Sequence, residues 1–391
     1  MKPSIHIPNR ILRETKRIFS RLRHTRMTLP VLSHVHLRAD ETGVRLMVSD
    51  LDHWLETTVS NDGHEPVSFL IPPDAMDVAC RADRGSIVSF TPRGSRKAGT
   101  IRLVVTQGGI EASSVHPTLD AKEFPEIPSI EGACVTLPPD TLRNLDSVAG
   151  CASKDITRHI LNGVCFTPVE GGRLVATDGK RLAICPAETP PHAFVLPMGP
   201  VSVLRHHGFS SDLCEFTWID CDDPDQRRVA FRCGAHLLVA TTLAGRYPDY
   251  QQVIPRDANQ LAVVSHDRRP GVIAWLRGLK AAGQRDPSVR LDWKKRGTSQ
   301  NGTLRLGHCD GEGRSSTLEV PVEIHGSPPS IAFHPEYLAD ALEIGGTICL
   351  NDEIGPGICR HPSGRFCVLM PMRLSAPAAN PNVEVSQSQA A

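Results

Sequence analysis

The sequence predicts an α+β protein of three similar domains, each with two helices packed on antiparallel sheets. Two observations lead to this prediction. Prolines and aspartates in similar sequence contexts recur at one long period. Each third of the chain also combines short strand-like runs with helical patterns that begin at a proline. The period is clearest in three prolines that lie 123 residues apart, Pro125, Pro248 and Pro371. Prolines that open a first helical pattern recur at intervals of 130 and 132 residues, at Pro8, Pro138 and Pro270.

Two further series keep the same order along the chain. Prolines that open a second helical pattern recur at intervals of 125 and 138 residues, at Pro72, Pro197 and Pro335. Aspartates that follow strand-like runs recur at intervals of 128 and 132 residues, at Asp50, Asp178 and Asp310. Four series in one order indicate three copies of one α+β unit.

The length agrees with three domains, because 391 residues allow two to four domains of about 100–200 residues with separate cores. We expect the domains to span residues 1–130, 131–258 and 259–374. Residues 375–391 lack aromatic side chains and are rich in Ala, Ser, Pro, Asn and Gln, so they are expected to form a disordered tail.

Composition limits the kinds of partner. Lys and Arg together number 43, and so do Asp and Glu. No overall field therefore draws the chain to nucleic acid or to a membrane, and any basic surface is local. The sequence has no apolar run long enough to span a bilayer and no secretory signal. The 12 cysteines form no C-x-x-C pair, so we expect buried thiols in a cytoplasmic protein.

The beginning of the chain is its most basic segment, with eight basic residues and one acid between Lys2 and Arg26. Apolar side chains fall on one helical face, at Ile11, Leu12, Ile18, Phe19 and Leu22. Arginines fall on another face, at Arg10, Arg13, Arg17 and Arg21. This pattern predicts a helix docked on a core with a basic outer side. A solvated surface, a surface that faces phosphates and an organelle targeting peptide remain open as interpretations.

A hairpin is expected where Asp178-Gly179 separates the apolar runs 173–177 and 181–185, since glycine adopts the left-handed backbone of a tight turn and aspartate tolerates it. The other expected strands are residues 35–38, 44–48, 54–59, 86–90, 100–105, 110–115, 160–166 and 366–374. The other expected helices are residues 72–79, 142–148, 200–206, 272–279 and 338–342.

Motifs of catalysis or metal binding are absent from the sequence. It contains no phosphate-binding loop, no H-E-x-x-H and no G-x-S-x-G. His206 and His207 are neighbours that would diverge on a helix, and Asp178 before glycine is typical of a turn. We therefore expect no enzyme activity, no metal and no cofactor, although a site assembled from dispersed Cys, His and Asp residues stays an alternative.

Six segments carry a resemblance to a known family. They are residues 28–33, 161–164, 176–183, 247–250, 334–342 and 368–374. In this order they resemble the signature segments of the bacterial sliding clamp, the beta subunit of DNA polymerase III. The pair Thr-Asp-Gly-Lys-Arg-Leu at 177–182 and Met-Pro-Met-Arg-Leu at 370–374 is the most specific part.

The resemblance implies a DNA-clamp fold in which two chains join head to tail as a six-domain ring. Helices would line the hole and sheets would form the outer wall. Duplex DNA would be held by topology, so modest basic potential suffices. The DNA-facing residues would be Arg10, Arg13, Arg17, Arg21, Arg26, Lys154, Arg158, Arg277 and Lys280. We expect the seam between the two chains near the edge strands at 110–115 and 304–306.

The resemblance also implies a tethering function as a processivity factor in DNA replication and repair. Polymerase III alpha subunit, clamp loader and other partners would dock short peptides in an apolar pocket between domains two and three. Carried over by motif, the pocket comprises Leu161, Thr177, Gly179, Lys180, Arg181, Leu182, Pro248, Gln252, Val253, Val368, Leu369, Met370, Pro371, Met372, Arg373 and Leu374. Arg181 and Arg373 would orient the peptide's polar groups.

This sequence departs from the family at several positions. Gln252 stands where arginine is frequent, Lys180 stands where histidine is common, and 17 residues follow Leu374. The cysteine-rich, aromatic-poor composition indicates a divergent member, one that serves a mobile element or acts as a second copy. The alternative is a clamp-fold protein that has lost ring closure and works as a peptide-binding module.

Overall fold

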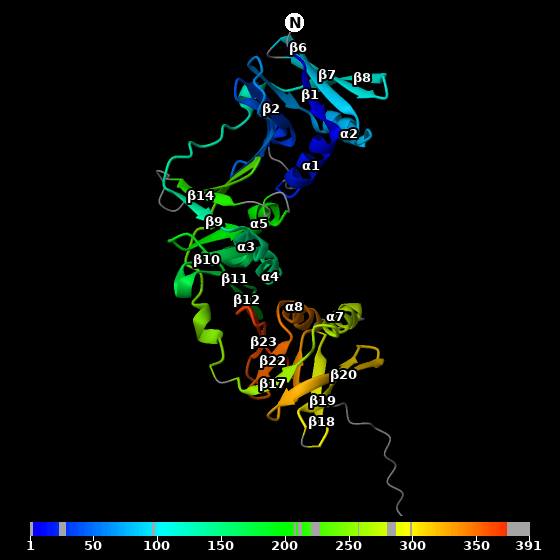
Figure 1. The fold of residues 1–391 in the computed structure, drawn as a ribbon, viewed down its shortest axis with the longest axis vertical. Helices are drawn as coiled ribbons and strands as arrows, with labels where there is room; N and C mark the ends of the chain where they lie inside the picture. The colour runs from blue at the N-terminus through cyan, green and yellow to red at the C-terminus, as the bar shows by residue number, and fades with distance from the viewer. Residues whose placement is uncertain are drawn as a thin grey trace, which may run out of the picture. The chain divides into compact units, whose positions relative to one another are not determined.

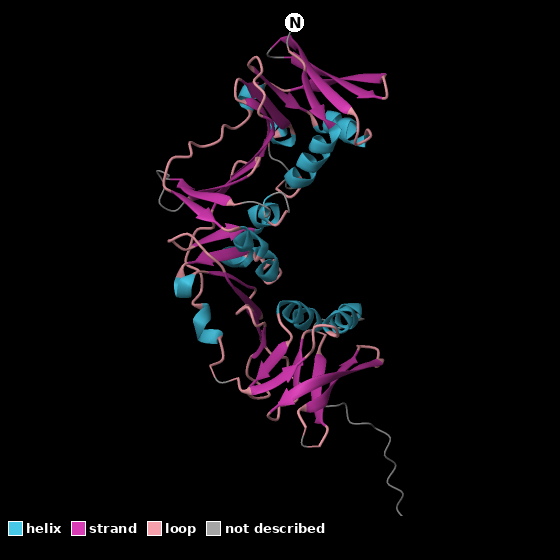
Figure 2. Cartoon of the chain, viewed as in Figure 1, coloured by secondary structure: helices cyan, strands magenta, loops and turns pink. Residues whose placement is uncertain are grey.

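The computed structural model describes residues 3–22, 29–95, 98–206, 209, 213–219, 227–256, 258–279, 287–297 and 299–373. By its internal contacts the chain divides into two compact units. The first unit comprises Met1–Gly179 and Ile184–Pro248, and the second comprises Lys180–Ala183 and Asp249–Ala391. Both units are built of antiparallel sheets and short helices, as the α+β prediction requires (Figures 1 and 2).

The first unit begins with two sheets and two helices. The strands are β1 (Ile5–Pro8), β2 (Val35–Asp40), β3 (Gly43–Ser49), β4 (His53–Ser60), β5 (Val67–Ile71), β6 (Ile87–Ser95), β7 (Ala98–Gln107) and β8 (Ile110–Thr118). The helices are α1 (Asn9–Phe19) and α2 (Pro73–Arg81). β1, β6, β7 and β8 form a four-stranded sheet in that order. The two helices pack on each other, and α1 also contacts β1 and β4.

The first unit continues with a second set of strands and helices. The strands are β9 (Cys134–Leu137), β10 (Gly163–Thr167), β11 (Arg173–Thr177), β12 (Arg181–Pro186), β13 (Phe194–Pro197), β14 (Cys214–Ile219), β15 (Arg228–Cys233) and β16 (His236–Thr241). The helices are α3 (Pro139–Arg143), α4 (Leu145–Ala149) and α5 (Met198–Leu204). Strands from both sets form one eight-stranded sheet in the order β5-β2-β3-β4-β16-β15-β14-β9.

The second unit contains one long antiparallel sheet. Its strands are β17 (Gln260–Val263), β18 (Val289–Lys295), β19 (Asn301–Cys309), β20 (Ser315–His325), β21 (Ile331–Phe333), β22 (Thr347–Leu350), β23 (Gly357–Arg360) and β24 (Phe366–Leu369). In this sheet the strands follow the order β24-β23-β22-β17-β20-β19-β18-β21. The helices α7 (Arg269–Gly278) and α8 (Pro335–Ile344) pack on each other (Figure 1).

One order of elements recurs three times in the described part of the chain. A strand and a helix, or the broken pair α3 and α4, precede four strands, a second helix and three strands. Pairings recur as well, since β1–β6, β9–β14 and β17–β22 each join a first strand to a sixth strand. The predicted domain limits at residues 130 and 258 stay a prediction, because the two contact units do not resolve the first two repeats.

Prolines start the helices because the first turn needs no backbone donor. Pro73, Pro139, Pro270 and Pro335 all lie in the first turn of their helices. The helix expected at 142–148 is instead divided between α3 and α4 at Asn144. The helix expected at 200–206 begins earlier, at Met198, because Pro197 precedes it as the N-cap.

At the predicted hairpin β11 has the expected bounds, β12 begins as expected and ends one residue later at Pro186, and Gly179 has a φ of 86°. Asp178 does not share the left-handed backbone. The strand expected at 160–166 begins only at Gly163, since residues 156–161 form a 3₁₀ turn capped by Asp155, whose carboxylate accepts from the Thr157 N–H. The strand expected at 366–374 ends at Leu369. Pro371 lacks the N–H that a longer ladder would use.

The interior of the first unit includes a cluster that the eight-stranded sheet shares with the segment between β8 and β9. Phe124 from that segment is buried against Met47, Trp54 and Leu237, together with Val31, Leu32, Leu70, Ile219, Ala230 and Val239. Trp54 lies on β4 and Leu237 lies on β16. The cluster therefore packs over the β4–β16 pair, where the two sets of strands join. Burial of these side chains therefore stabilises the pairing of β4 with β16.

We expect Gly163→Ala to destabilise the first unit by about 1–3 kcal/mol, because overpacking a dense interior forces the backbone to move. A Cβ at Gly163 would lie 2.3 Å from the carbonyl oxygen of Leu196 on the neighbouring strand β13. Gly199→Ala is the matched control, since a Cβ there meets nothing within 4 Å. Differential scanning calorimetry checks the prediction, and equal melting temperatures for the two variants would contradict it.

Candidate functional site

Helix α1 carries the basic face that the sequence predicts. Leu12, Thr15, Ile18 and Phe19 are buried beneath it. Arg10, Arg17 and Arg21 are exposed. Arg21 donates from Nη1 to the carbonyl of Ser202 at 3.1 Å, a contact that leaves its charge unbalanced.

The other two basic side chains of α1 are more constrained. Arg13 is half-buried and donates from Nη2 to the carbonyl of Ala82 at 2.7 Å. Lys16 forms an ion pair with Asp77, with 2.6 Å between Nζ and Oδ1. The outward-facing charge of this helix and of the turn after it therefore lies mainly on Arg10 and Arg17 of α1 and on Arg21.

The loop before β10 presents a second basic surface of the first unit. Lys154 and Arg158 are both exposed. Arg158 lies 4.0 Å from Asp155, and its Nη1 lies 2.9 Å from the position that a Cβ at Gly179 would occupy. Ile156 in the same loop is exposed as well. A glycine at 179 thus satisfies both the positive φ and the space taken by Arg158.

The predicted peptide-binding residues divide between the two units. The first unit contains Leu161, which is buried, together with Thr177, Gly179 and Pro248. Thr177 Oγ1 accepts from the N–H of Gly179 at 3.1 Å and so supports the turn. The second unit contains the remaining described members, from Lys180 to Leu182, at Gln252 and Val253, and from Val368 to Arg373.

In the second unit, the segments 180–182 and 368–373 lie together. The backbone N–H of Met370 donates to the carbonyl of Lys180 at 2.9 Å, and that of Met372 donates to Ala332 at 2.7 Å. Leu182, Val368 and Leu369 are buried. In contrast, Met370 is 46% exposed and Val253 is 47% exposed. Met370 and Val253 are therefore apolar groups that a ligand can reach without unfolding the unit.

The contacts of Arg181 favour a structural role within the second unit over the predicted role of orienting a peptide. Only 10% of its side chain is exposed, and its guanidinium forms an ion pair with Asp340 of α8. The same group lies over the ring of Tyr337, 4.4 Å from the centroid. Cation–π and ionic contacts both fix α8 against the segment 180–182. Arg373 is exposed, so it keeps the predicted orienting role as a hypothesis.

Asp340 also balances the predicted DNA-facing residue Arg277. Arg277 Nη2 lies 3.1 Å from Asp340 and 2.8 Å from Glu343. The hydrogen bond to Asp340 raises the pKa of Arg277, with Glu343 adding to the effect. Two carboxylates neutralise this guanidinium, which reduces what it offers to a phosphate. Arg26, Lys280 and Leu374 lie outside the described residues.

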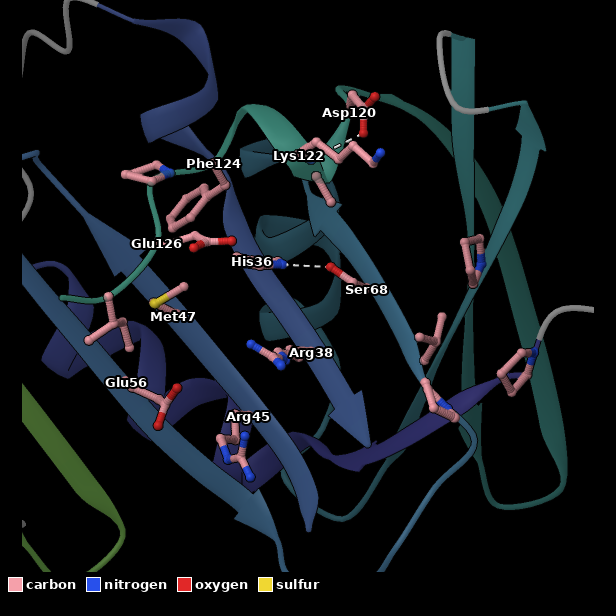
Figure 3. Close-up of a pocket in the computed structure, with 17 residues that line it drawn as sticks. His36, Arg38, Arg45, Met47, Glu56, Ser68, Asp120, Lys122, Phe124 and Glu126 are labelled. Carbon is pink, nitrogen blue, oxygen red and sulfur yellow. Dashed lines mark hydrogen bonds between the residues drawn. The ribbon is translucent and has the colours of Figure 1, made fainter. Parts of the chain in front are cut away.

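A cavity of about 910 Å³ lies in the first unit between strands β2–β5 and residues 120–127 (Figure 3). His36, Arg38, Arg45 and Glu56 line the sheet side, and Phe124 lies opposite them. None of the residues predicted to contact DNA or peptides lines this cavity. No local sequence pattern pointed to this cavity, because its lining residues run from Pro3 to Ile127 and only the fold brings them together.

Charges on the sheet side of this cavity compensate one another. Asp40 lies 3.6 Å from Arg38 and 3.4 Å from Arg45. Burial lowers the pKa of His36 to about 4, helped by the charge of Arg38, so the ring is neutral at pH 7. Burial raises the pKa of Glu56 against the nearby charges of Arg45 and Arg232. The wall therefore presents little excess charge to a ligand.

The cysteines among the described residues are free thiols, and most are buried. Burial raises the pKa of Cys165 to about 12, so this thiol stays protonated at neutral pH. Within the described residues no three His, Cys, Asp or Glu side chains come close enough to hold a metal ion. No helix in the described part of the chain is long and apolar enough to cross a membrane.

We expect Asp340→Asn to destabilise the second unit by about 2 kcal/mol, because the Arg181 guanidinium then loses its charged partner in a largely buried place. Glu343→Gln is the control, since Glu343 pairs with the half-exposed Arg277. Chemical denaturation followed by tryptophan fluorescence checks the difference. Equal midpoints for Asp340→Asn and Glu343→Gln would show that the Arg181 contact contributes little.

Comparison with known proteins agrees with the geometry. The chain is 29% identical over 380 residues to the beta sliding clamp of Synechococcus elongatus, which covers 91% of this chain and 96% of that protein. It is 28% identical over 365 residues to the beta sliding clamp of Caulobacter vibrioides, covering 89% and 94%. No family model matches the chain.

Solved structures show the same fold. The DNA polymerase III beta subunit of Thermotoga maritima superposes with a TM-score of 0.77 at 22% identity, over 95% of this chain and all of that one. The sliding clamp of Pseudomonas aeruginosa bound to griselimycin gives 0.78 at 23% identity, over 96% of this chain and all of that one. The fold is therefore the DNA-clamp fold. The chain is similar along most of its length to bacterial beta sliding clamps, at an identity that fits a divergent relative of them.

Proposed function

We propose that this chain is a DNA sliding clamp that encircles duplex DNA and tethers polymerases to it. The observation that carries the proposal is a sequence match to beta sliding clamps along almost the whole of both chains. A non-catalytic role follows, because a tether acts by holding its partners near one another.

The proposed DNA-facing surface of the first unit consists of Arg10 and Arg17 on α1, Arg21 in the turn after it, and Lys154 and Arg158 in the loop before β10. All five side chains are exposed. Contacts of this kind are ionic and independent of base sequence, which suits a protein that must move along DNA. Arg277 contributes less, because Asp340 and Glu343 already neutralise it.

The proposed peptide-binding surface centres on Met370. Its side chain is exposed although the preceding residues Val368 and Leu369 are buried, and Val253 is exposed as well. Methionine suits a surface that accepts different apolar anchors, because its unbranched thioether adapts its shape. Clamp-binding peptides of polymerase alpha subunit and of the clamp loader are the expected ligands. A cytoplasmic location remains a prediction from the sequence.

We expect Met370→Ala to weaken binding of a fluorescent clamp-binding peptide from a polymerase alpha subunit by about fivefold, the loss typical of an exposed apolar anchor. Fluorescence anisotropy measures the affinity. Ile354→Ala removes a comparable apolar group, 86% exposed, elsewhere in the second unit. Leu182 is a poorer choice, because it is buried and its truncation also costs stability. If Met370→Ala and Ile354→Ala bind the peptide equally, the surface is assigned wrongly.

Ring closure requires two strand edges that can pair between copies. In the first unit β4, the fourth strand of its repeat, pairs with β16, the eighth strand of the next repeat. By the same rule β20 of one copy would pair with β8 of another. β8 pairs with β7 along one side among the described strands, and the part of β20 before Glu323 pairs with β19 alone. We therefore propose a head-to-tail homodimer joined by β8 and β20.

This proposal revises part of the expected seam. Residues 304–306 lie on β19, which is paired with β18 on one side and β20 on the other. A strand with both edges paired has no backbone groups left for another chain. Residues 110–115 lie on β8, where Ile110 is 75% exposed and Val115 is 58% exposed.

We expect the wild-type protein to be a dimer that stays on nicked circular DNA and leaves when the DNA is linearised. The double variant Ile110→Asp/Val115→Asp should be a monomer that is not retained, because the charges oppose apolar contact across the new strand pair. Light scattering and gel filtration with DNA measure both effects. Leu213→Asp/Ile354→Asp is the control for added charge on exposed apolar residues. A wild-type monomer that still binds the peptide would favour the alternative of a non-ring interaction module.

A further inference from the structure

A small cavity of about 200 Å³ lies in the second unit, apart from the predicted peptide-binding residues. It is formed where α7 begins, where α8 ends and where the loop between β23 and β24 passes. Four basic side chains line it, His266, Arg269, His361 and Arg365, and Glu343 is the one acid among its lining residues. Cations therefore exceed anions around this cavity.

The two arginines are held in place by backbone carbonyls. Arg365 donates from Nε to the carbonyl of Ile344 at 3.2 Å, and Arg269 donates from Nη1 to that of Leu342 at 3.4 Å. Neither arginine takes part in an ion pair with a described residue, and the buried Nε of Arg269 has no hydrogen-bond partner there. The guanidinium groups are thus positioned while part of their hydrogen-bonding capacity is unused.

The only acid of the cavity is engaged elsewhere. Glu343 of α8 forms an ion pair with Arg277 of α7, with 2.8 Å between Oε1 and Nη2. Burial lowers the pKa of His361, and the charges of Arg365, Arg269 and His266 lower it further. The electrostatic surroundings of this histidine are therefore positive.

The histidine ring is also oriented. The backbone N–H of Ser363 donates to Nδ1 of His361 at 3.1 Å. The neutral ring therefore carries its proton on Nε2, which leaves a donor on the opposite side of the ring.

A pair of glycines makes this arrangement possible. A Cβ at Gly346 would lie 2.9 Å from Cδ of Arg269 and 2.5 Å from the carbonyl oxygen of Val264. A Cβ at Gly345 would lie 2.2 Å from the carbonyl of Arg360, next to His361. Both positions need glycine so that α7 and the β23–β24 loop can approach the end of α8.

We propose that this cluster is a binding site for a phosphate-type oxyanion, held by Arg269 and Arg365 with His266 and His361. Guanidinium groups match the oxygens of a phosphate, and charge-assisted hydrogen bonds are the strong ones. Two sources supply this chemistry, a phosphodiester of duplex DNA and a free phosphoanion. The assignment of DNA as the ligand rests on the proposed clamp function. The assignment of an oxyanion site does not.

The test uses the full-length protein and two probes. Isothermal titration measures pyrophosphate binding, and fluorescence anisotropy measures binding to a short duplex as salt is varied. Arg269→Gln and Arg365→Gln each remove one cation from the cavity. Arg268→Gln is the matched control, because Arg268 precedes Arg269 but donates to the carbonyl of Pro321 and does not line the cavity. Melting temperatures identify any variant that fails to fold, in which case the other cavity variant decides.

We expect each cavity variant to bind pyrophosphate at least about fivefold more weakly than the control. If duplex affinity also falls, with a salt slope smaller by about 1, the ligand is the DNA backbone. If duplex affinity is unchanged, the ligand is a free phosphoanion. A wild-type protein that does not bind pyrophosphate, or a loss as large in Arg268→Gln as in the cavity variants, overturns the site. A protein that binds pyrophosphate but is not retained on circular DNA refutes the clamp function alone.

Discussion

Backbone pairing between β4 and β16 is the interaction on which the first unit depends. It joins strands that are about 180 residues apart in the chain and so makes one eight-stranded sheet from two repeats. Unpaired strand edges are costly and prone to aggregate, so a protein of open sheets must pair or protect them. In this chain the pairing is covered by the Phe124 cluster, which buries apolar side chains from β3, β4 and β16 together.

The same need to pair strand edges directs attention to two edges of this chain, those of β8 and β20. The edge of β8 is exposed and carries apolar side chains. Among the described strands, β20 pairs with β19 alone ahead of the short segment that also pairs with β17. In the proposed homodimer, a second copy that repeats the β4–β16 contact would satisfy both edges at once and close the assembly without leaving new ones. Ring formation, in this view, continues a rule that already holds within one chain.

Charge is distributed by local compensation. The chain has no net charge, yet its basic groups fall into two classes. Arg181 and Arg277 are balanced by Asp340, and Arg38 and Arg45 by Asp40, so these side chains serve the fold. The exposed arginines of α1 and the cluster around Arg269 lack such partners among the described residues. The arginines of the second class are the ones suited to bind phosphate groups, because a guanidinium that is already paired with a carboxylate binds a phosphate more weakly.

The amino-acid sequence by itself determined the class of fold and many local elements. Asp178-Gly179 marks a turn because glycine relieves a positive φ, and prolines mark helix starts because the first turn needs no donor. These signals are local, and so they can be read from a few neighbouring residues. The buried face of α1 was predictable for the same reason, since the helical period places Leu12, Ile18 and Phe19 together.

Only the tertiary structure decided which charged side chains are available. Arg181 sits in a signature segment, but its partner Asp340 lies 159 positions further along the chain. Arg269 and Arg365 meet only because α7, the end of α8 and the β23–β24 loop converge beside Gly345 and Gly346. Ion pairing and burial depend on distances between remote segments, which no local pattern encodes. The sequence therefore predicts which groups are present, and the packing of distant elements decides which of them can meet a ligand.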